Sequence, residues 1–371
     1  MSEHAIVVEG LKKHFDEVKA LDGIDLEVPA GTIFGLLGPN GAGKTTAVRI
    51  LATVLPPDAG RAEIMGFDVV RQADGVRRRI GLAGQNAAVD PNLTGRENLR
   101  MVGILNQMPK PAVVKRADEL LERFGLSHAA NRPLRTYSGG MRRRLDIAAS
   151  LVQSPPVLLL DEPTTGLDVF SRNELWEMIR ELVSTGTTVL LTTQYLEEAD
   201  RLAASIAVVD GGKVIANDTP ERLKADLGST VVEIVVRGDG KAERATELLT
   251  RQLTGEHVER ERDTVRITSN IGARVLLQAL RSLDGEGLEP DALTVREPSI
   301  DDVFLALTGH RAEIEANGNG TGNGNGHAKD DTAARAMAAE AEAGPGAAVQ
   351  AAANRVTQPV AEQRGTKGDD R

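Results

Sequence analysis

Short apolar runs bounded by glycine, proline or charged residues alternate with amphipathic segments along the first part of the chain. Residues 5–8 and the alternating stretch 24–28 predict half-exposed antiparallel strands. Residues 32–37, 156–160 and 188–192 are mostly apolar, which is typical of fully buried strands in a parallel sheet. Segments with apolar residues at helical spacing lie between them, and this alternation predicts an α/β fold.

A glycine-rich loop joins the buried strand 32–37 to a helical segment at 45–51. Glycines let the backbone turn tightly and point several N–H groups at a phosphate, and the helix N-terminus adds partial positive charge. We expect Lys44 to reach the β- and γ-phosphates and the Thr45 hydroxyl to bind Mg²⁺. The loop fits G-x-x-x-x-G-K-[ST] at every fixed position and predicts a nucleotide site made of Gly38, Pro39, Asn40, Gly41, Ala42, Gly43, Lys44, Thr45 and Thr46.

Two adjacent carboxylates, Asp161 and Glu162, follow the buried strand 156–160. Sheets of this class place their ligands at the carboxyl ends of the strands. We therefore expect Asp161 to orient Mg²⁺ and Glu162 to accept a proton from an attacking water. A solvated acidic turn is the alternative interpretation.

Between these two motifs, residues 86–153 predict a helical subdomain inserted into the α/β domain. Thr94 and Glu97 have the spacing of a capping box at a helix start. The insertion includes Ser138-Gly139-Gly140-Met141, where Ser138 can cap a further helix and the glycine amides can hold an anion.

The pattern changes after residue 228. Residues 229–310 predict a small α+β domain whose element order resembles a ferredoxin-like arrangement, with strands at 231–236, 264–267 and 292–295. The sequence of this domain shows no cluster of candidate catalytic or metal-binding residues, so a dimerisation or regulatory role is a hypothesis. Residues 311–371 contain a glycine- and asparagine-rich linker at 317–326 and hold few large apolar side chains, so we expect a disordered tail.

Composition narrows the class of protein. The chain has 371 residues, of which 41% are hydrophobic, and 44 basic against 54 acidic residues give a net charge of −10. Nothing at the level of the whole chain therefore indicates a nucleic-acid binder. Cysteine is absent, which excludes disulfides and thiolate metal sites. The sequence shows no secretory signal, and its apolar runs are far shorter than the ~20 residues of a membrane span.

The motifs together resemble the nucleotide-binding domain of an ABC transporter over residues 5–228. The resemblance implies a P-loop NTPase fold and rests on the P-loop, Gln85, Ser138-Gly139-Gly140-Met141, Leu160-Asp161-Glu162 and Gly166-Leu167-Asp168, in that order. It implies that Phe15 stacks on adenine, that Gln85 senses Mg²⁺ and the membrane partner, and that Glu162 is the catalytic glutamate. Residues 138–141 match the signature motif, and Ser138, Gly139, Gly140 and Asp168 are expected at the nucleotide.

Three longer segments, at 137–145, 192–200 and 299–309, resemble the daunorubicin-resistance-type ATPases of actinobacterial exporters. Gln194 stands where most ABC ATPases carry a switch histidine that contacts the γ-phosphate. A glutamine can donate a hydrogen bond but cannot become charged. Glu162 would then act without a titrating neighbour at this position, and slow turnover is a hypothesis, although the same glutamine is typical of the daunorubicin-resistance-type subgroup.

The resemblance also implies an assembly. In ABC ATPases the signature of one subunit covers the P-loop nucleotide of the other, so we expect a homodimer that binds ATP and Mg²⁺. We expect it to dock, at the cytoplasmic face of the cell membrane, on a separate ABC-2-type permease and to power efflux of a hydrophobic drug. A lipid or cell-envelope component is an equally permitted substrate.

Two arginine runs, at 77–79 and 142–144, leave an alternative open. We interpret them as solvated or dimer-facing surface, and the rival is an ABC-type ATPase that acts on nucleic acid or the ribosome. The single cassette, the short insertion and the absence of cysteine argue against the nucleic-acid classes. A non-catalytic regulatory module is a third alternative, against which the intact Lys44, Asp161 and Glu162 argue.

Overall fold

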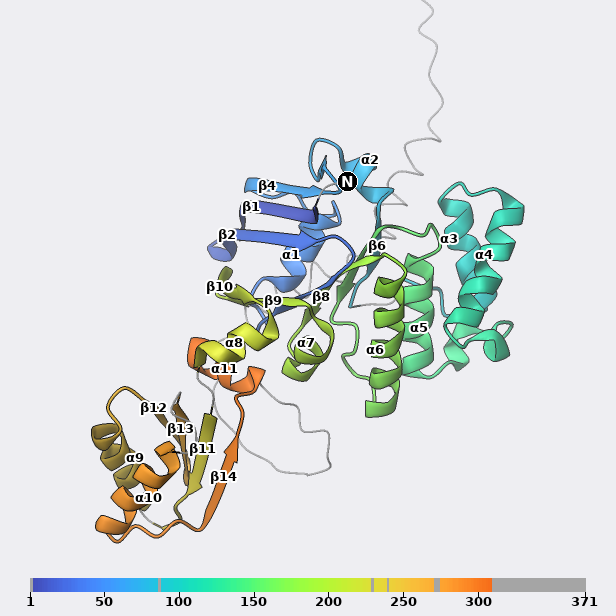
Figure 1. The fold of residues 1–371 in the computed structure, drawn as a ribbon. Helices are drawn as coiled ribbons and strands as arrows, with labels where there is room; N and C mark the ends of the chain where they lie inside the picture. Colours follow the sequence, from blue (N-terminus) through green and yellow to red (C-terminus); the bar gives the residue numbers. More distant parts are fainter. Residues whose placement is uncertain (1–2, 86–87, 228–229, 239, 270–273, 309–371) are drawn as a thin grey trace, which may run out of the picture. The chain divides into compact units, whose positions relative to one another are not determined.

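The computed structural model describes residues 3–85, 88–227, 230–238, 240–269 and 274–308 (Figure 1). The chain divides into two compact units, 1–314 and 315–371, and the second lies entirely outside the described residues. The predicted disorder of 311–371 and the predicted boundary at 228/229 therefore fall on parts that the structure does not describe.

An antiparallel sheet forms from the N-terminal part in the order β2-β1-β4-β5. Its strands are β1 (His4–Phe15), β2 (Val18–Pro29), β4 (Ala59–Ile64) and β5 (Phe67–Asp68). The two predicted antiparallel strands are confirmed as partners, but they are longer than their apolar cores, and β1 extends to Phe15. The strands β4 and β5 and the short helix α2 (Ala73–Arg77) were not predicted from the sequence.

A second sheet has the order β10-β9-β3-β8-β7-β6, and all its pairs are parallel except that of β9 and β10. Its strands are β3 (Ile33–Leu37), β6 (Ile80–Ala83), β7 (Val157–Asp161), β8 (Thr188–Thr193), β9 (Ser205–Asp210) and β10 (Lys213–Asp218). Every residue of β3, β7 and β8 is buried, which confirms the prediction of fully buried strands.

Alternate residues of these strands enter two different cores. Leu158 and Leu160 pack on the side of α5 (Gly139–Ser150) and α6 (Val169–Ser184). Val157 and Leu159 pack on the opposite side with α1 (Lys44–Leu51) and the antiparallel sheet. The central strands thus need apolar residues on both faces, which explains why their sequences do not alternate.

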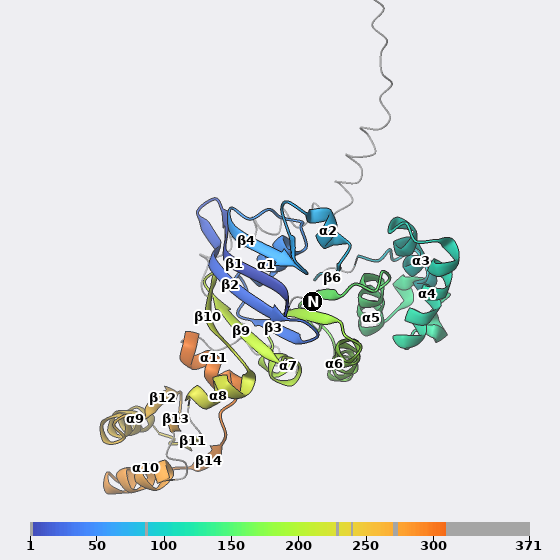
Figure 2. The same cartoon turned by 45° about the horizontal axis from the view of Figure 1, so that its top comes forward.

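The helical subdomain contains α3 (Gly95–Leu105), α4 (Lys110–Arg123), two 3₁₀ turns, η1 (Ser127–Ala129) and η2 (Leu134–Thr136), and then α5. Thr94 and Glu97 form the predicted capping box at the start of α3. Figure 2 shows α3 and α4 beside α5, on its side away from the antiparallel sheet. None of the helices within the described ranges combines the length and apolar character required to cross a membrane.

The predicted ferredoxin-like order of the C-terminal part is confirmed. Its sheet has the strand order β12-β13-β11-β14. When β11 is counted as the first strand and the sheet is read from the β14 edge, the order is fourth, first, third, second, as in a ferredoxin-like sheet. The elements are β11 (Thr230–Val235), α9 (Lys241–Gln252), β12 (His257–Glu261), β13 (Thr264–Ser269), α10 (Arg274–Gly285) and β14 (Ala292–Arg296). The strand β12 is mostly charged, with valine as its one apolar residue, and was not predicted from the sequence.

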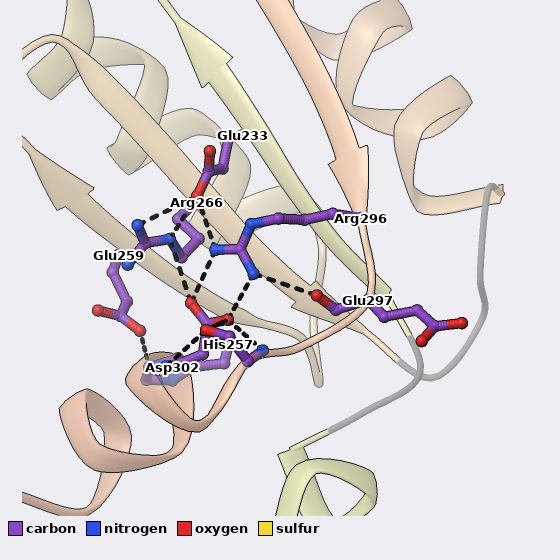
Figure 3. Close-up of polar contacts among 8 residues, drawn as sticks. Glu233, His257, Glu259, Arg266, Arg296, Glu297 and Asp302 are labelled. Atoms are coloured by element: carbon purple, nitrogen blue, oxygen red, sulfur yellow. Dashed lines mark hydrogen bonds and ion pairs between the residues drawn. The ribbon is translucent and has the colours of Figure 1, made fainter. Parts of the chain in front are cut away.

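The last described helix, α11 (Ile300–Thr308), has contacts with two sets of elements. Its residues Ile300, Val303 and Phe304 share a core with residues of β3, α7 (Leu196–Leu202) and α8 (Pro220–Leu227). On its polar side, Asp302 accepts two hydrogen bonds from the guanidinium of Arg296 in β14, at 2.6 and 2.9 Å (Figure 3). Arg296 also donates to Glu233 in β11 at 2.8 Å, so a charged cluster joins α11 to the small sheet.

The pKa values of two neighbouring aspartates of α11 are shifted in opposite directions. Burial alone raises the pKa of Asp302, but the hydrogen bonds from Arg296 and Ser299 outweigh it and lower that pKa overall. Burial and the nearby charge of Asp302 raise the pKa of Asp301. The ionised form is therefore favoured at position 302 and disfavoured at position 301.

We predict that Asp302→Asn lowers the free energy of unfolding by about 1–3 kcal/mol at pH 7, because Arg296 keeps Glu233 but loses its charged partner at position 302. Asp301→Asn is the matched control and should leave stability unchanged or slightly higher. Because the pKa of Asp302 is lowered, its contribution is complete above the ordinary pKa of about 4 and is lost as pH falls below it. Urea unfolding of both variants at pH 7 and pH 3 measures this, and equal losses in the two variants would contradict it.

Candidate active site

The register of the parallel sheet brings three chain segments together. Leu37 at the end of β3 pairs with Thr193 in β8, and Asp161 at the end of β7 pairs with Thr192. The amide of Gly38 donates to the Thr193 carbonyl at 3.3 Å. The P-loop, the two carboxylates and the segment after β8 therefore start from the same edge of the sheet.

The P-loop backbone accepts only glycine at two of its turns. A Cβ atom at Gly38 would lie 2.2 Å from the Val209 carbonyl oxygen. At Gly43, where φ is +106°, a Cβ atom would lie 2.3 Å from the Ala20 carbonyl oxygen. The loop is thus pressed against β9 and β2, and α1 begins at the next residue, Lys44.

The Lys44 ammonium group lies across the loop. Its Nζ donates to the carbonyls of Gly38 at 2.8 Å and Pro39 at 3.0 Å, and it lies 3.7 Å from Oε1 of Glu162. Burial lowers the pKa of Lys44, and the negative charges of Glu162 and Asp161 partly oppose this. A buried cation held mainly by carbonyls is placed to exchange these partners for an anionic ligand.

Asp161 meets two hydroxyl groups. Its Oδ1 accepts from Thr192 Oγ1 at 2.6 Å and from Thr45 Oγ1 at 3.1 Å, and the residue is 3% exposed. Mg²⁺ prefers oxygen ligands, and in nucleotide sites it uses one or two protein groups together with phosphates and water. The Thr45 and Asp161 oxygens fit this requirement.

Glu162 has an unusual backbone conformation. Its φ is +47°, which for a residue other than glycine costs on the order of 1–3 kcal/mol. Its amide donates to the carbonyl and the hydroxyl of Thr192, at 3.2 and 3.0 Å. Its carboxylate accepts from Thr165 at 3.3 Å and faces Lys44, so this conformation keeps the carboxylate at the P-loop.

Ser138 and Asp168, two further predicted site residues, each cap a helix. Ser138 caps α5 by accepting from the Met141 amide at 3.2 Å, and Ser138 and Gly139 are exposed. Asp168 caps α6 by accepting from the Ser171 amide at 2.9 Å, and this bond lowers the pKa of Asp168. No hydrogen bond or ion pair found among the described residues joins Ser138 or Asp168 to the P-loop.

Phe15, Gln85 and Gln194 also stay predictions as nucleotide contacts. Phe15 is half-buried at the end of β1, and the Lys13 ammonium lies 5.7 Å from its ring centroid. Gln85 is exposed just after β6. Gln194 is half-buried and follows Thr193, whose carbonyl binds the P-loop amide.

Two buried polar residues, Arg143 and Glu198, were not predicted from the sequence. Arg143 was expected at the surface together with its neighbours, but it is buried, and only Arg142 of that run is fully exposed. The signal was its helical spacing from Gly140 and Ile147, both buried. Glu198 on α7 is fully buried and accepts from Trp176 at 3.0 Å, and burial raises the pKa of Glu198.

Comparisons with known proteins agree with this geometry. A family model described as ABC transporter matches residues 21–165. A daunorubicin resistance ATP-binding protein, DrrA3 of Streptomyces coeruleorubidus, is 52% identical over 83% of this chain and 97% of its own length. A Nod factor export ATP-binding protein I of Ralstonia nicotianae is 40% identical over 81% of this chain and 93% of its own length.

Among solved structures, the ATP-binding cassette MJ0796, in a dimeric post-hydrolysis state bound to ADP and Pi, has a TM-score of 0.53 and 27% identity. The match covers 58% of this chain and 98% of that cassette. The similarity to whole ATP-binding proteins and the P-loop geometry lead to one conclusion. The chain belongs to the ABC transporter family, as a nucleotide-binding, ATP-hydrolysing subunit.

Proposed function

We propose that this subunit powers export of a hydrophobic, drug-like compound through a separate membrane subunit. The observation that carries the proposal is the meeting of Lys44, Thr45 and the carboxylates of Asp161 and Glu162 at one sheet edge. The 52% identical relative is a daunorubicin resistance ATP-binding protein, which supports a drug as the cargo.

Each residue of the group has a role in in-line attack of water on the γ-phosphate. The P-loop amides and Lys44 bind the phosphates, and Glu162 accepts a proton from the water. Thr45 and Asp161 would hold Mg²⁺, with Gln85 nearby, and the ion would neutralise charge that develops on the phosphate oxygens. Gln194 donates a hydrogen bond to the γ-phosphate, since an amide can do so without a change of protonation.

The site requires a second copy of the chain. Ser138 and Gly139 are exposed at the start of α5 and lack a described bond to their own P-loop. Backbone amides at a helix start bind phosphate well. The proposal is that Ser138, Gly139, Gly140 and Asp168 of one copy complete the nucleotide site of the other, and that Phe15 stacks on adenine.

The membrane-spanning part belongs to another chain in this proposal. The homodimer would dock on an ABC-2-type permease at the cytoplasmic face of the membrane, with Gln85 near the contact. We take residues 1–228 as the ATPase domain and 229–310 as an accessory domain. A lipid or cell-envelope component is the alternative cargo, and the 40% identical relative named for Nod factor export supports keeping it.

Lys44→Ala should weaken ATP binding by at least tenfold, because Lys44 is expected to contact the β- and γ-phosphates directly. Lys115→Ala removes a lysine whose side chain is 82% exposed and serves as the control. Equilibrium titration with a fluorescent ATP analogue measures both variants. Equal affinities would remove Lys44 from its assigned role.

Glu162→Gln should slow ATP hydrolysis by ~10²–10⁴-fold and leave ATP affinity within about threefold, because the amide cannot accept the proton. Single-turnover hydrolysis and an ATP titration on the same preparation separate the two effects. Turnover at the wild-type rate would show that another group is the base.

Tagged Glu162→Gln protein, with ATP and Mg²⁺ present, should co-purify with a polytopic membrane protein in equal amount from gently solubilised cells. The variant is expected to hold ATP, and with it the closed dimer, for longer. Mass spectrometry identifies the partner, and loss of that partner in Lys44→Ala is the control. Recovery of ribosomes or DNA without a membrane protein would favour the nucleic-acid alternative instead.

A further inference from the structure

Arg143, on the first turns of α5, is a buried cation that binds three backbone carbonyls. Its Nη1 donates to Gly84 at 2.5 Å, its Nε to Pro163 at 2.8 Å and its Nη2 to Asp161 at 3.1 Å. The residue is 9% exposed. One planar guanidinium thus connects the helix of the signature motif to two separate loops.

Asp146, on the same face of α5, balances this charge. Its Oδ2 lies 3.3 Å from Arg143 Nη1, and its Oδ1 accepts from the Ala88 amide at 2.8 Å. Burial lowers the pKa of Arg143 and raises that of Asp146, while their mutual attraction opposes both shifts. Loss of either residue of such a buried pair would leave the other charge buried and uncompensated. Arg143 and Asp146 are therefore held in one arrangement.

The two carbonyls of Asp161 and Pro163 lie on either side of Glu162. The amide of Glu162 is bound by Thr192, and its φ of +47° is uncommon for a residue with a side chain. The carbonyls before and after it are both held by Arg143. This arrangement fixes the short stretch of backbone that aims the Glu162 carboxylate.

The third carbonyl, that of Gly84, precedes Gln85. Since the guanidinium is rigid and planar, a displacement of the Gly84 backbone would move the nitrogen atoms that hold the Glu162 loop. The same side chain therefore offers a direct mechanical connection between the segment at Gln85 and the loop of the two carboxylates.

We propose that Arg143 is a positioning residue for ATP hydrolysis, which holds the backbone on both sides of Glu162 in the orientation required for proton transfer. The proposal rests on the proposed function, because it takes Glu162 as the base. A purely structural role for Arg143 would affect folding and ATP affinity, whereas a positioning role affects the rate of hydrolysis.

The test compares Arg143→Lys and Arg143→Gln in the full-length protein. ATP hydrolysis is measured in the preparation in which the wild-type protein is active, either the isolated protein or its complex with the co-purified membrane partner. Lysine keeps the charge but cannot bind three carbonyls in one plane. We expect kcat to fall by about 10–100-fold, since small misplacements of a reacting group have effects of this size, with KM and ATP affinity within threefold. Arg116→Gln is the control, because Arg116 donates to the Leu151 and Val152 carbonyls at the other end of α5.

The same substitution in the Glu162→Gln variant tests whether Arg143 acts through Glu162. When Arg143→Lys is added to Glu162→Gln, the residual turnover should change by less than about twofold, because no base remains to be positioned. An equal loss in both backgrounds would overturn the proposal, as would wild-type kcat in Arg143→Lys. Loss of ATP binding in both Arg143 variants would assign the residue to the fold and also overturn it. Wild-type turnover in Glu162→Gln alone would instead refute the proposed function.

Discussion

Backbone hydrogen bonds between β3, β8 and β7 bring distant parts of the sequence to one edge of a buried sheet. Leu37, Thr193 and Asp161 end these strands at adjacent register positions. A slip of one residue would exchange the two faces of a strand, which here enter different cores. Apolar packing on both faces therefore fixes the register, and the register fixes where the P-loop and the two carboxylates begin.

Thr192 shows how the sheet continues into the site. It is the second-last residue of a fully buried strand, yet its hydroxyl donates to Asp161 and accepts from the Glu162 amide. Lys44, the first residue of α1, shares its charge between two carbonyls and the Glu162 carboxylate. An anion that approached Lys44 would therefore also approach the Glu162 carboxylate, which lies 3.7 Å from the same ammonium group.

Much of this arrangement could be predicted from local sequence. The P-loop glycines, the apolar strands and the Thr94 capping box depend on short segments, and the structure confirms the strands and the box. Contacts between distant segments could not be predicted in this way. Arg143 looked like one of three surface arginines, because nothing in a run of like charges reveals the carbonyls of Gly84, Asp161 and Pro163. The charged segment β12 forms a strand because it pairs with β13, and its own sequence gives little indication of a strand.

The sequence holds one tryptophan, and its position gives it a use beyond packing. Trp176 is buried on α6, the helix that Asp168 caps, and its indole N–H binds Glu198 on α7, which follows Gln194. Indole emission is sensitive to such a hydrogen bond and to the nearby guanidinium of Arg201, 5.5 Å from the ring centroid. The unmodified protein therefore carries a single tryptophan, whose emission lies at longer wavelengths than that of its two tyrosines, at the contact between the helix capped by Asp168 and the helix that follows Gln194. Relative movement of these helices during the ATP cycle can be followed optically, without an introduced label.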